Sequence, residues 1–161
     1  SRLFLDEELP FCDAIFEVEV MAELGFGFAD LILAVPNCWV DVDTLDDLDA
    51  AAAAFRARHG FRLRIATKYH RLVREFLKQA GVADYQIVDS QGATEGTVKN
   101  ETAEAIADIT SSGETLRANH LKILSDGLIL KSQACLLRAR GADVSADERR
   151  DLADLLGKLG L

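Results

Sequence analysis

The chain has 161 residues, and 49% of them are hydrophobic, which is enough to bury a core in one domain or in two small lobes. Its formal net charge is −9, and such a surface repels nucleic acid because no basic stripe with interleaved aromatic residues offsets it. No apolar run approaches the length of a membrane span, and no basic-then-apolar leader precedes the first predicted strand. We therefore expect partners other than nucleic acids and membranes.

Two strands are predicted in the first quarter of the chain. Apolar and acidic residues alternate over 16–20, which indicates a strand with one buried face. The continuous apolar run 30–35 instead indicates a strand that is buried on both faces. Between them, the glycines of Gly25–Phe26–Gly27 are expected to let strands cross near a hinge.

The middle of the chain alternates helices and strands. A helix is predicted from its N-cap Thr44 to Gly60, because acidic residues occupy its first turns and basic residues its last turn. Strands are predicted at 63–66, 85–88 and 106–109, with a helix at 69–80 between the first two. This order implies right-handed crossovers and a parallel sheet, which binds its ligands at the carboxyl ends of the strands.

The last part of the chain is predicted to contain a hairpin and a helix. Strands at 121–124 and 128–130 are expected on either side of a turn at Asp126–Gly127. Ser145 and Glu148 form a capping box, and the leucines that follow share one helical face.

Cysteine and histidine residues give no sign of a metal centre. The cysteines are an odd number without C-x-x-C spacing, and we interpret them as reduced, buried thiols of a cytosolic protein: Cys12, Cys38 and Cys135. The histidines are dispersed along the chain without the spacing of metal ligands: His59, His70 and His120.

The segment 108–116 is the most informative in the sequence. A buried strand leads into the lone acid Asp108, then into small hydroxyl residues and Gly113, and then into a segment able to begin a helix. Gly113 can adopt a positive φ, and backbone N–H groups at a helix start attract anions. Hydroxyl groups that could add donors are those of Thr110, Ser111, Ser112 and Thr115. Asp108 could accept hydrogen bonds from sugar hydroxyls, so the loop suits a ribose 5-phosphate; an ordinary turn is the alternative that the pattern alone leaves open.

Residues around this loop resemble the signature of ATP phosphoribosyltransferases, the first enzymes of histidine biosynthesis. The matching residues are Glu95, Ala103, Ile106, Asp108, Ile109, Ser112, Gly113, Thr115 and Leu116. Further similarity lies at 24–30, 65–69, 92–96, 115–120 and 132–136, so that it covers most of the chain from about Glu23 to Arg138. The chain departs from the family at Glu101, where the family usually has a glycine.

The resemblance implies an α/β fold of two lobes, similar to type II periplasmic binding proteins, with mainly parallel sheets. Residues 1–37 and 119–161 would form the first lobe with the C-terminal helix, and 38–118 an inserted second lobe that carries the phosphoribosyl-binding loop. The family's usual first strand and basic turn have no counterpart here. We therefore expect a first lobe that is incomplete and lacks its amino-terminal region.

The resemblance also implies an activity and a set of site residues. The family transfers the phosphoribosyl group of phosphoribosyl pyrophosphate to N1 of ATP, with Mg²⁺ bound to the substrates, and relies on positioning and electrostatics without a catalytic residue. The expected substrate-binding residues are Glu95, Asp108, Thr110, Ser111, Ser112, Gly113, Glu114 and Thr115. Lys68 and Arg71 could contact nucleotide or pyrophosphate, although a solvated helix start would explain them equally well.

Expected partners follow from the same resemblance. The chain resembles the short form of the family, which works in the cytoplasm with a separate regulatory subunit similar to histidyl-tRNA synthetase, as a homodimer or hetero-oligomer. Two alternatives stay open: a non-catalytic two-lobe binding module, and a folded but inactive fragment of the enzyme.

Overall fold

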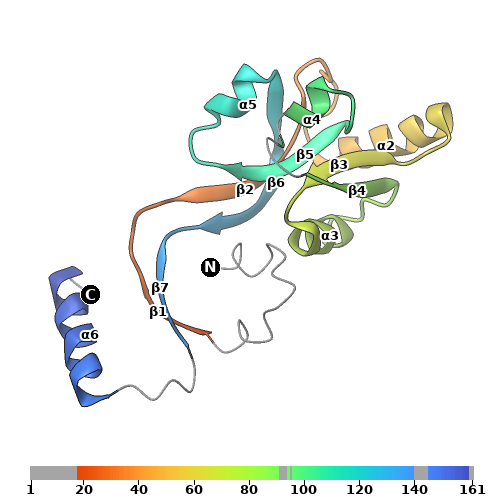
Figure 1. Cartoon of the computed structure of the whole chain (residues 1–161). Coiled ribbons are helices and arrows are strands. Elements are labelled where there is room, and N and C mark those ends of the chain that lie inside the picture. The colour runs from red at the N-terminus through yellow and green to blue at the C-terminus, as the bar shows by residue number, and fades with distance from the viewer. Residues whose placement is uncertain (1–17, 91–93, 95, 140–144, 160–161) are drawn as a thin grey trace.

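The computed structural model describes residues 18–90, 94, 96–139 and 145–159. The strands are β1 (Val18–Glu23), β2 (Ala29–Pro36), β3 (Leu63–Thr67), β4 (Tyr85–Asp89), β5 (Ala105–Thr110), β6 (Leu121–Ser132) and β7 (Cys135–Ala139) (Figure 1). The helices are α2 (Leu45–His59), α3 (His70–Gln79), α4 (Gly96–Lys99), α5 (Glu114–Ala118) and α6 (Ala146–Leu159). Of these, the sequence did not predict β7 or the single turn of α4.

Five strands form one sheet in the order β4-β3-β5-β2-β6. Strand β3 pairs in parallel with β4 and β5, whereas β2 pairs antiparallel with both β5 and β6. It follows that β2 alone runs against the other four strands. The predicted α/β class with a mainly parallel sheet is therefore confirmed.

Strand β2 is buried on both faces, as its apolar run predicted. The five residues Leu31–Val35 are each no more than 3% exposed. Leu31 and Leu33 pack with α2 and α3 on one face, whereas Ile32 and Ala34 pack with α4 and α5 on the other. Figure 1 shows α3 and the pair α4 and α5 on opposite sides of the sheet.

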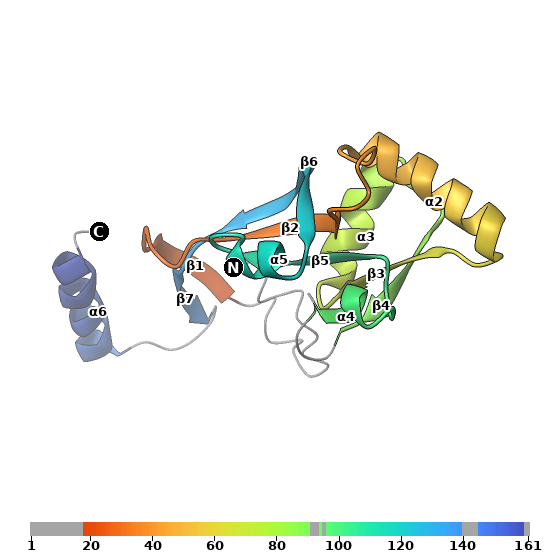
Figure 2. The same cartoon turned by 90° about the horizontal axis from the view of Figure 1, so that it is seen from above.

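A second sheet consists of β1 and β7 alone, paired antiparallel. Between the two sheets the connecting segments run side by side: Leu24 N donates to Ala134 O at 2.9 Å, and Ala134 N donates to Phe26 O at 2.9 Å. Gly25 and Gly27 have φ of +69° and +63° there, conformations that side chains disfavour. The glycines therefore permit the backbone path of this connection, and Figure 2 shows β1 and β7 leading away from the five-stranded sheet toward α6.

The caps predicted for the two long helices are present. The Thr44 side chain accepts from Asp47 N at 3.2 Å, and Asp47 Oδ2 accepts from Thr44 N at 2.9 Å. The Thr44 hydroxyl also donates to Asp47 Oδ2 at 2.8 Å, and this bond, followed by those from the amides of Asp43 and Thr44, holds the pKa of Asp47 below its usual value. The same reciprocal pair joins Ser145 and Glu148 at the start of α6, with donor–acceptor distances of 2.8 and 3.2 Å.

The turn predicted at Asp126–Gly127 is wrong, because the residues belong to the continuous strand β6. Asp126 accepts hydrogen bonds from Leu45 N at 2.9 and 3.2 Å, and so supports the start of α2. A Cβ at Gly127 would lie 2.9 Å from Leu33 O. The glycine is therefore required by the close approach of β6 to β2, where the pairing register shifts, and not by a change of chain direction.

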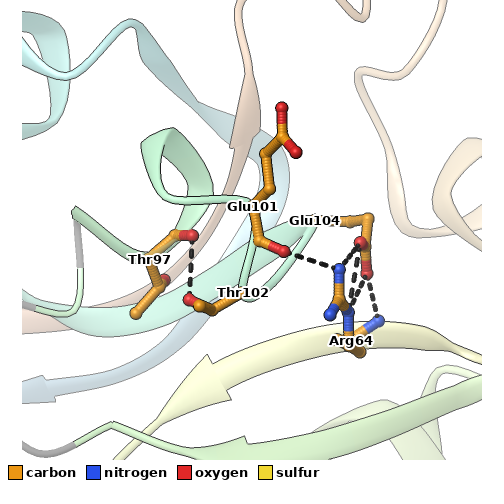
Figure 3. A network of polar contacts seen from close by, with 5 residues as sticks. All are labelled: Arg64, Thr97, Glu101, Thr102 and Glu104. Atoms are coloured by element: carbon orange, nitrogen blue, oxygen red, sulfur yellow. Dashed lines mark hydrogen bonds and ion pairs between the residues drawn. The ribbon is translucent and has the colours of Figure 1, made fainter.

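Glu101 occupies a position that suits glycine. Its φ is +57°, the left-handed region in which a Cβ is strained. Arg64 holds this turn, because its Nη2 donates to Glu101 O at 2.9 Å while its Nε donates to both carboxylate oxygens of Glu104 (Figure 3). The bonds with Glu104 raise the pKa of Arg64. The glycine that the family usually has here is thus explained by backbone conformation.

Replacing Glu101 by glycine should stabilise the chain by about 0.5–1 kcal/mol, because left-handed strain of about 1–2 kcal/mol is relieved at a smaller entropic cost. Chemical denaturation followed by circular dichroism measures the difference. The control is Asn100→Gly, at an exposed neighbour without a positive φ, which should lower stability. An equal loss of stability in both variants would contradict the assignment of strain to Glu101.

Candidate functional site

The carboxyl ends of β3, β4 and β5 lie at the same end of the sheet, because these strands are parallel. We call this end the carboxyl edge, and the end where the strands begin the amino edge. Thr67 pairs with Asp89, and Ala66 pairs with Ile106, which leaves β5 extending four residues beyond that pair to Thr110. Lys68 follows β3, and the loop Thr110–Thr115 follows β5. The structure thus brings most of the residues predicted for the site to a single edge.

The loop after β5 is closed by its own hydroxyl groups. Gly113 N donates to Thr110 Oγ1 at 2.9 Å, and Glu114 N donates to Ser112 Oγ at 3.3 Å. Gly113 is buried, has a φ of +70° and caps the start of α5. A Cβ at this position would lie 3.2 Å from Arg117 Nη1, so glycine is favoured by conformation and by space.

Three amides of the loop face no protein acceptor in the part of the chain that the structure describes: those of Ser111, Ser112 and Thr115. These three residues are also exposed. The hydroxyls of Thr110 and Ser112 accept from amides within the loop, but each keeps a hydrogen that it can donate outward. The loop can therefore present N–H and O–H donors together to an anion.

Arg117 is a candidate site residue that the sequence reasoning missed. It lies one helical turn after Gly113, and its Nη1 lies 3.2 Å from where a Cβ of that glycine would be. The signal available in the sequence was the i, i+4 spacing, which puts both residues on one side of a helix. A permanent cation at this place favours a bound anion.

Asp108 lies on β5 opposite Ile32 of β2 and is partly buried. Alternate residues of a strand share a face, so Asp108 and Thr110 lie on the face that α4 and α5 cover. Asp108 Oδ1 accepts from Ile109 N at 2.8 Å. One carboxylate oxygen is therefore committed to fixing the strand end just before the loop. Glu114, at the first position of α5, is exposed.

The ends of β3 and β4 are tied together beneath the edge. Thr67 is fully buried, and its carbonyl accepts from Ser90 N at 3.3 Å while its hydroxyl accepts from Tyr69 N at 3.0 Å. Ser90 Oγ in turn donates to the buried Thr94 Oγ1 at 2.8 Å. This buried network fixes the backbone that carries the neighbouring candidate site residues.

Lys68 and Arg71 are both exposed at this same edge, where α3 begins. Glu95 lies outside the described residues, while Thr94 and Gly96 on either side of it follow β4 at this edge. Cys38 and Cys135 are free thiols, but the prediction that they are buried is wrong, because Cys38 is exposed and Cys135 is only partly buried; Cys12 lies outside the described part. The described residues contain no cluster of three or more potential metal ligands, and none of the described helices combines the length and apolar character of a membrane span.

Comparison with known proteins identifies the family. A family model described as ATP phosphoribosyltransferase matches residues 5–159. A protein of that name from Cereibacter sphaeroides is 74% identical over 149 residues, which are 92% of this chain and 63% of the relative. Another from Mesorhizobium japonicum is 55% identical over 88% of this chain and 61% of the relative. The chain thus spans somewhat less than two thirds of the relatives it matches.

Solved structures agree with this fold. The ATP phosphoribosyl transferase (HisG:HisZ) complex from Thermotoga maritima matches 89% of this chain and 60% of its own, with a TM-score of 0.62 at 20% identity. An extracellular-binding protein of a probable amino-acid ABC transporter from Bacillus subtilis matches 91% of this chain and 62% of its own, with a TM-score of 0.52 at 12% identity. These likenesses confirm the predicted fold, similar to periplasmic binding proteins. By the match over 5–159, the chain belongs to the ATP phosphoribosyltransferase family.

Proposed function

We propose that this chain performs the reaction named by its family, the transfer of the phosphoribosyl group from phosphoribosyl pyrophosphate to N1 of ATP. The observation that carries the proposal is the Thr110–Thr115 loop, whose outward donors lie at the carboxyl edge of the sheet. Relatives with this name are up to 74% identical to the chain. That degree of identity favours the enzyme over a non-catalytic binding module, since the binding protein from Bacillus subtilis is only 12% identical.

In the proposed complex the loop binds the 5-phosphate of the ribosyl donor. The amides of Ser111, Ser112 and Thr115 donate to its oxygens, and Arg117 contributes a positive charge. Neutral amides are well suited to this role, because they bind an anion without requiring an ion pair on a chain of net charge −9. Asp108 and Glu95 accept hydrogen bonds from the ribose hydroxyls. Glu114, an acid beside the phosphate, turns its side chain away from it.

The chemical step joins N1 of ATP to C1 of the ribose while the bond from C1 to the pyrophosphate oxygen breaks. Inversion at C1 through an oxocarbenium-like state needs no protein nucleophile, so catalysis rests on alignment and charge stabilisation. Lys68 and Arg71, exposed at the same edge, are the cations that would contact nucleotide or departing pyrophosphate. Mg²⁺ would arrive with the substrates and screen their phosphates.

The lobe division is part of the proposal. Residues 38–118 would form the inserted lobe that carries the loop, and 1–37 with 119–161 the other. The five-stranded sheet extends from Ala29 to Ser132, so β2 and β6 would be the strands through which the two lobes connect. Such a connection at a strand pair allows closure over two substrates.

Regulation by a separate subunit similar to histidyl-tRNA synthetase also belongs to the proposal. Its support is the HisG:HisZ complex among the structures of similar fold. A homodimer or hetero-oligomer in the cytoplasm would be the working form, as expected of a biosynthetic enzyme.

Replacing Gly113 by valine should weaken binding of phosphoribosyl pyrophosphate by about tenfold or more, since one lost charge-assisted hydrogen bond costs about 1.5–3 kcal/mol. Calorimetric titration of this chain with the donor measures the loss. Gly60→Val is the matched control, because Gly60 also has a positive φ, +78°, but lies at the end of α2. Equal affinity for phosphoribosyl pyrophosphate in the wild-type chain and in Gly113→Val would show that the loop does not bind the donor.

Replacing Asp108 by asparagine should lower donor affinity and transferase activity about tenfold with little change in thermal stability. Asparagine keeps an oxygen for Ile109 N but loses the charge that strengthens bonds from ribose hydroxyls. Pyrophosphate release and thermal denaturation are measured on the same samples, with Asp46→Asn on the exposed face of α2 as the control. A variant that unfolds without a selective loss would make Asp108 a structural residue.

A further inference from the structure

A hollow lies at the end of the sheet opposite to the Thr110–Thr115 loop, where β3 and β4 begin. It has a volume of about 650 Å³ and is lined by the residue before β3, by the second half of α3, by the segment that follows α3 and by the first residues of β4. Tyr85, in its wall, pairs with Leu63 where both strands begin. The length of β3 therefore separates this hollow from the Thr110–Thr115 loop, which follows the carboxyl end of β5.

Three cations converge on this hollow from two segments of the chain. Arg62 immediately precedes β3, while Arg74 and Lys78 are one turn apart on α3 and so lie on one side of that helix. Helix α3 begins at the carboxyl end of β3 and returns to the start of β4, which brings its last turns beside Arg62. Within the described part of the chain, none of the three forms an ion pair.

Among the described residues, no aspartate or glutamate lines the hollow. The nearest acids in the sequence are engaged elsewhere: Asp84 is paired with Arg56, and Glu75 accepts from Gln79 and lines a separate hollow between α3 and β6. Three uncompensated positive charges in one concavity are unexpected on a chain of net charge −9. A cation near the carboxyl end of a helix can be explained by the helix dipole, which would account for Lys78 but not for Arg62 or Arg74.

Neutral donors complete the wall. Tyr85 is half-buried, and this burial raises the pKa of its hydroxyl, while Arg74 lowers it. The hydroxyl therefore stays protonated at neutral pH and can donate. The exposed Gln86, whose side chain carries an amide, also lines the hollow.

We propose that this hollow binds a polyphosphate chain, either free or as part of a nucleoside polyphosphate. Arginine presents paired donors that match two phosphate oxygens, and lysine adds a point charge, so three cations can hold consecutive phosphates. The volume falls in the range of small-ligand sites. The site is separate from the proposed substrate loop, and the proposal does not rest on the transferase activity.

Titration with inorganic tripolyphosphate, followed by the backbone amide resonances of the chain, tests the proposal residue by residue. We expect shifts at Gly81–Ile87, and a separate set at Ser111–Thr115 if the loop also binds phosphate. The double variant Arg74→Gln/Lys78→Gln should weaken the first set at least about tenfold. Lys99→Gln, which removes an exposed cation of α4, should leave it unchanged. Tighter binding of ATP than of tripolyphosphate would identify a nucleotide as the ligand, and equal binding a free polyphosphate.

Two results would overturn the proposal. One is the absence of shifts at Gly81–Ile87 at millimolar tripolyphosphate, and the other is an equal loss of affinity in the double variant and in Lys99→Gln, which would indicate attraction by general surface charge. Gly113→Val separates the two sites, because it should abolish the shifts at the loop and preserve those at Gly81–Ile87. Circular dichroism of the double variant verifies its fold, and its substituted residues are exposed.

Discussion

The complete burial of β2 is the constraint on which the rest of the structure depends. The backbone groups of Leu31–Val35 cannot reach water, so they require strand partners on both sides. Strands β5 and β6 supply these partners. Strand β5 is antiparallel to β2 and parallel to β3, so the loop after β5 emerges at the same edge as the ends of β3 and β4. The position of the candidate site therefore depends on β5, which pairs with the buried strand on one side and with β3 on the other.

The two edges of the sheet differ in how they carry positive charge. At the carboxyl edge the loop offers mainly amides and hydroxyls, which suit the binding of a phosphate. At the amino edge, Arg64 is paired with Glu104 and Arg56 with Asp84. The remaining cations around the hollow at the start of β4 have no such partners among the described residues. At this edge two arginines are thus neutralised by acids, whereas the three cations around the hollow are not.

Strain is confined to short connections beside the core. Glu101 has a left-handed backbone, and Arg64 of β3 donates a hydrogen bond to the carbonyl oxygen of that residue. Gly113 has a similar φ at the start of α5, where glycine carries no Cβ to be strained. The same backbone conformation is therefore achieved by tertiary contacts in one turn and by residue type in the other.

Sequence alone determined the features that are local along the chain. The caps at Thr44 and Ser145, the doubly buried run at 30–35 and the left-handed Gly113 involve residues within a few positions of one another, where propensity and spacing are decisive. Resemblance to the family likewise led to the loop at Thr110–Thr115. The turn expected at Asp126–Gly127 failed because contacts with Leu45 and Leu33, far away in the sequence, govern these residues. Only the tertiary structure decided that β2 lies between β5 and β6, and that Arg62 meets Arg74 and Lys78 around one hollow. Long-range pairing and the return path of α3 determine these arrangements, and neither leaves a periodic signal in the sequence.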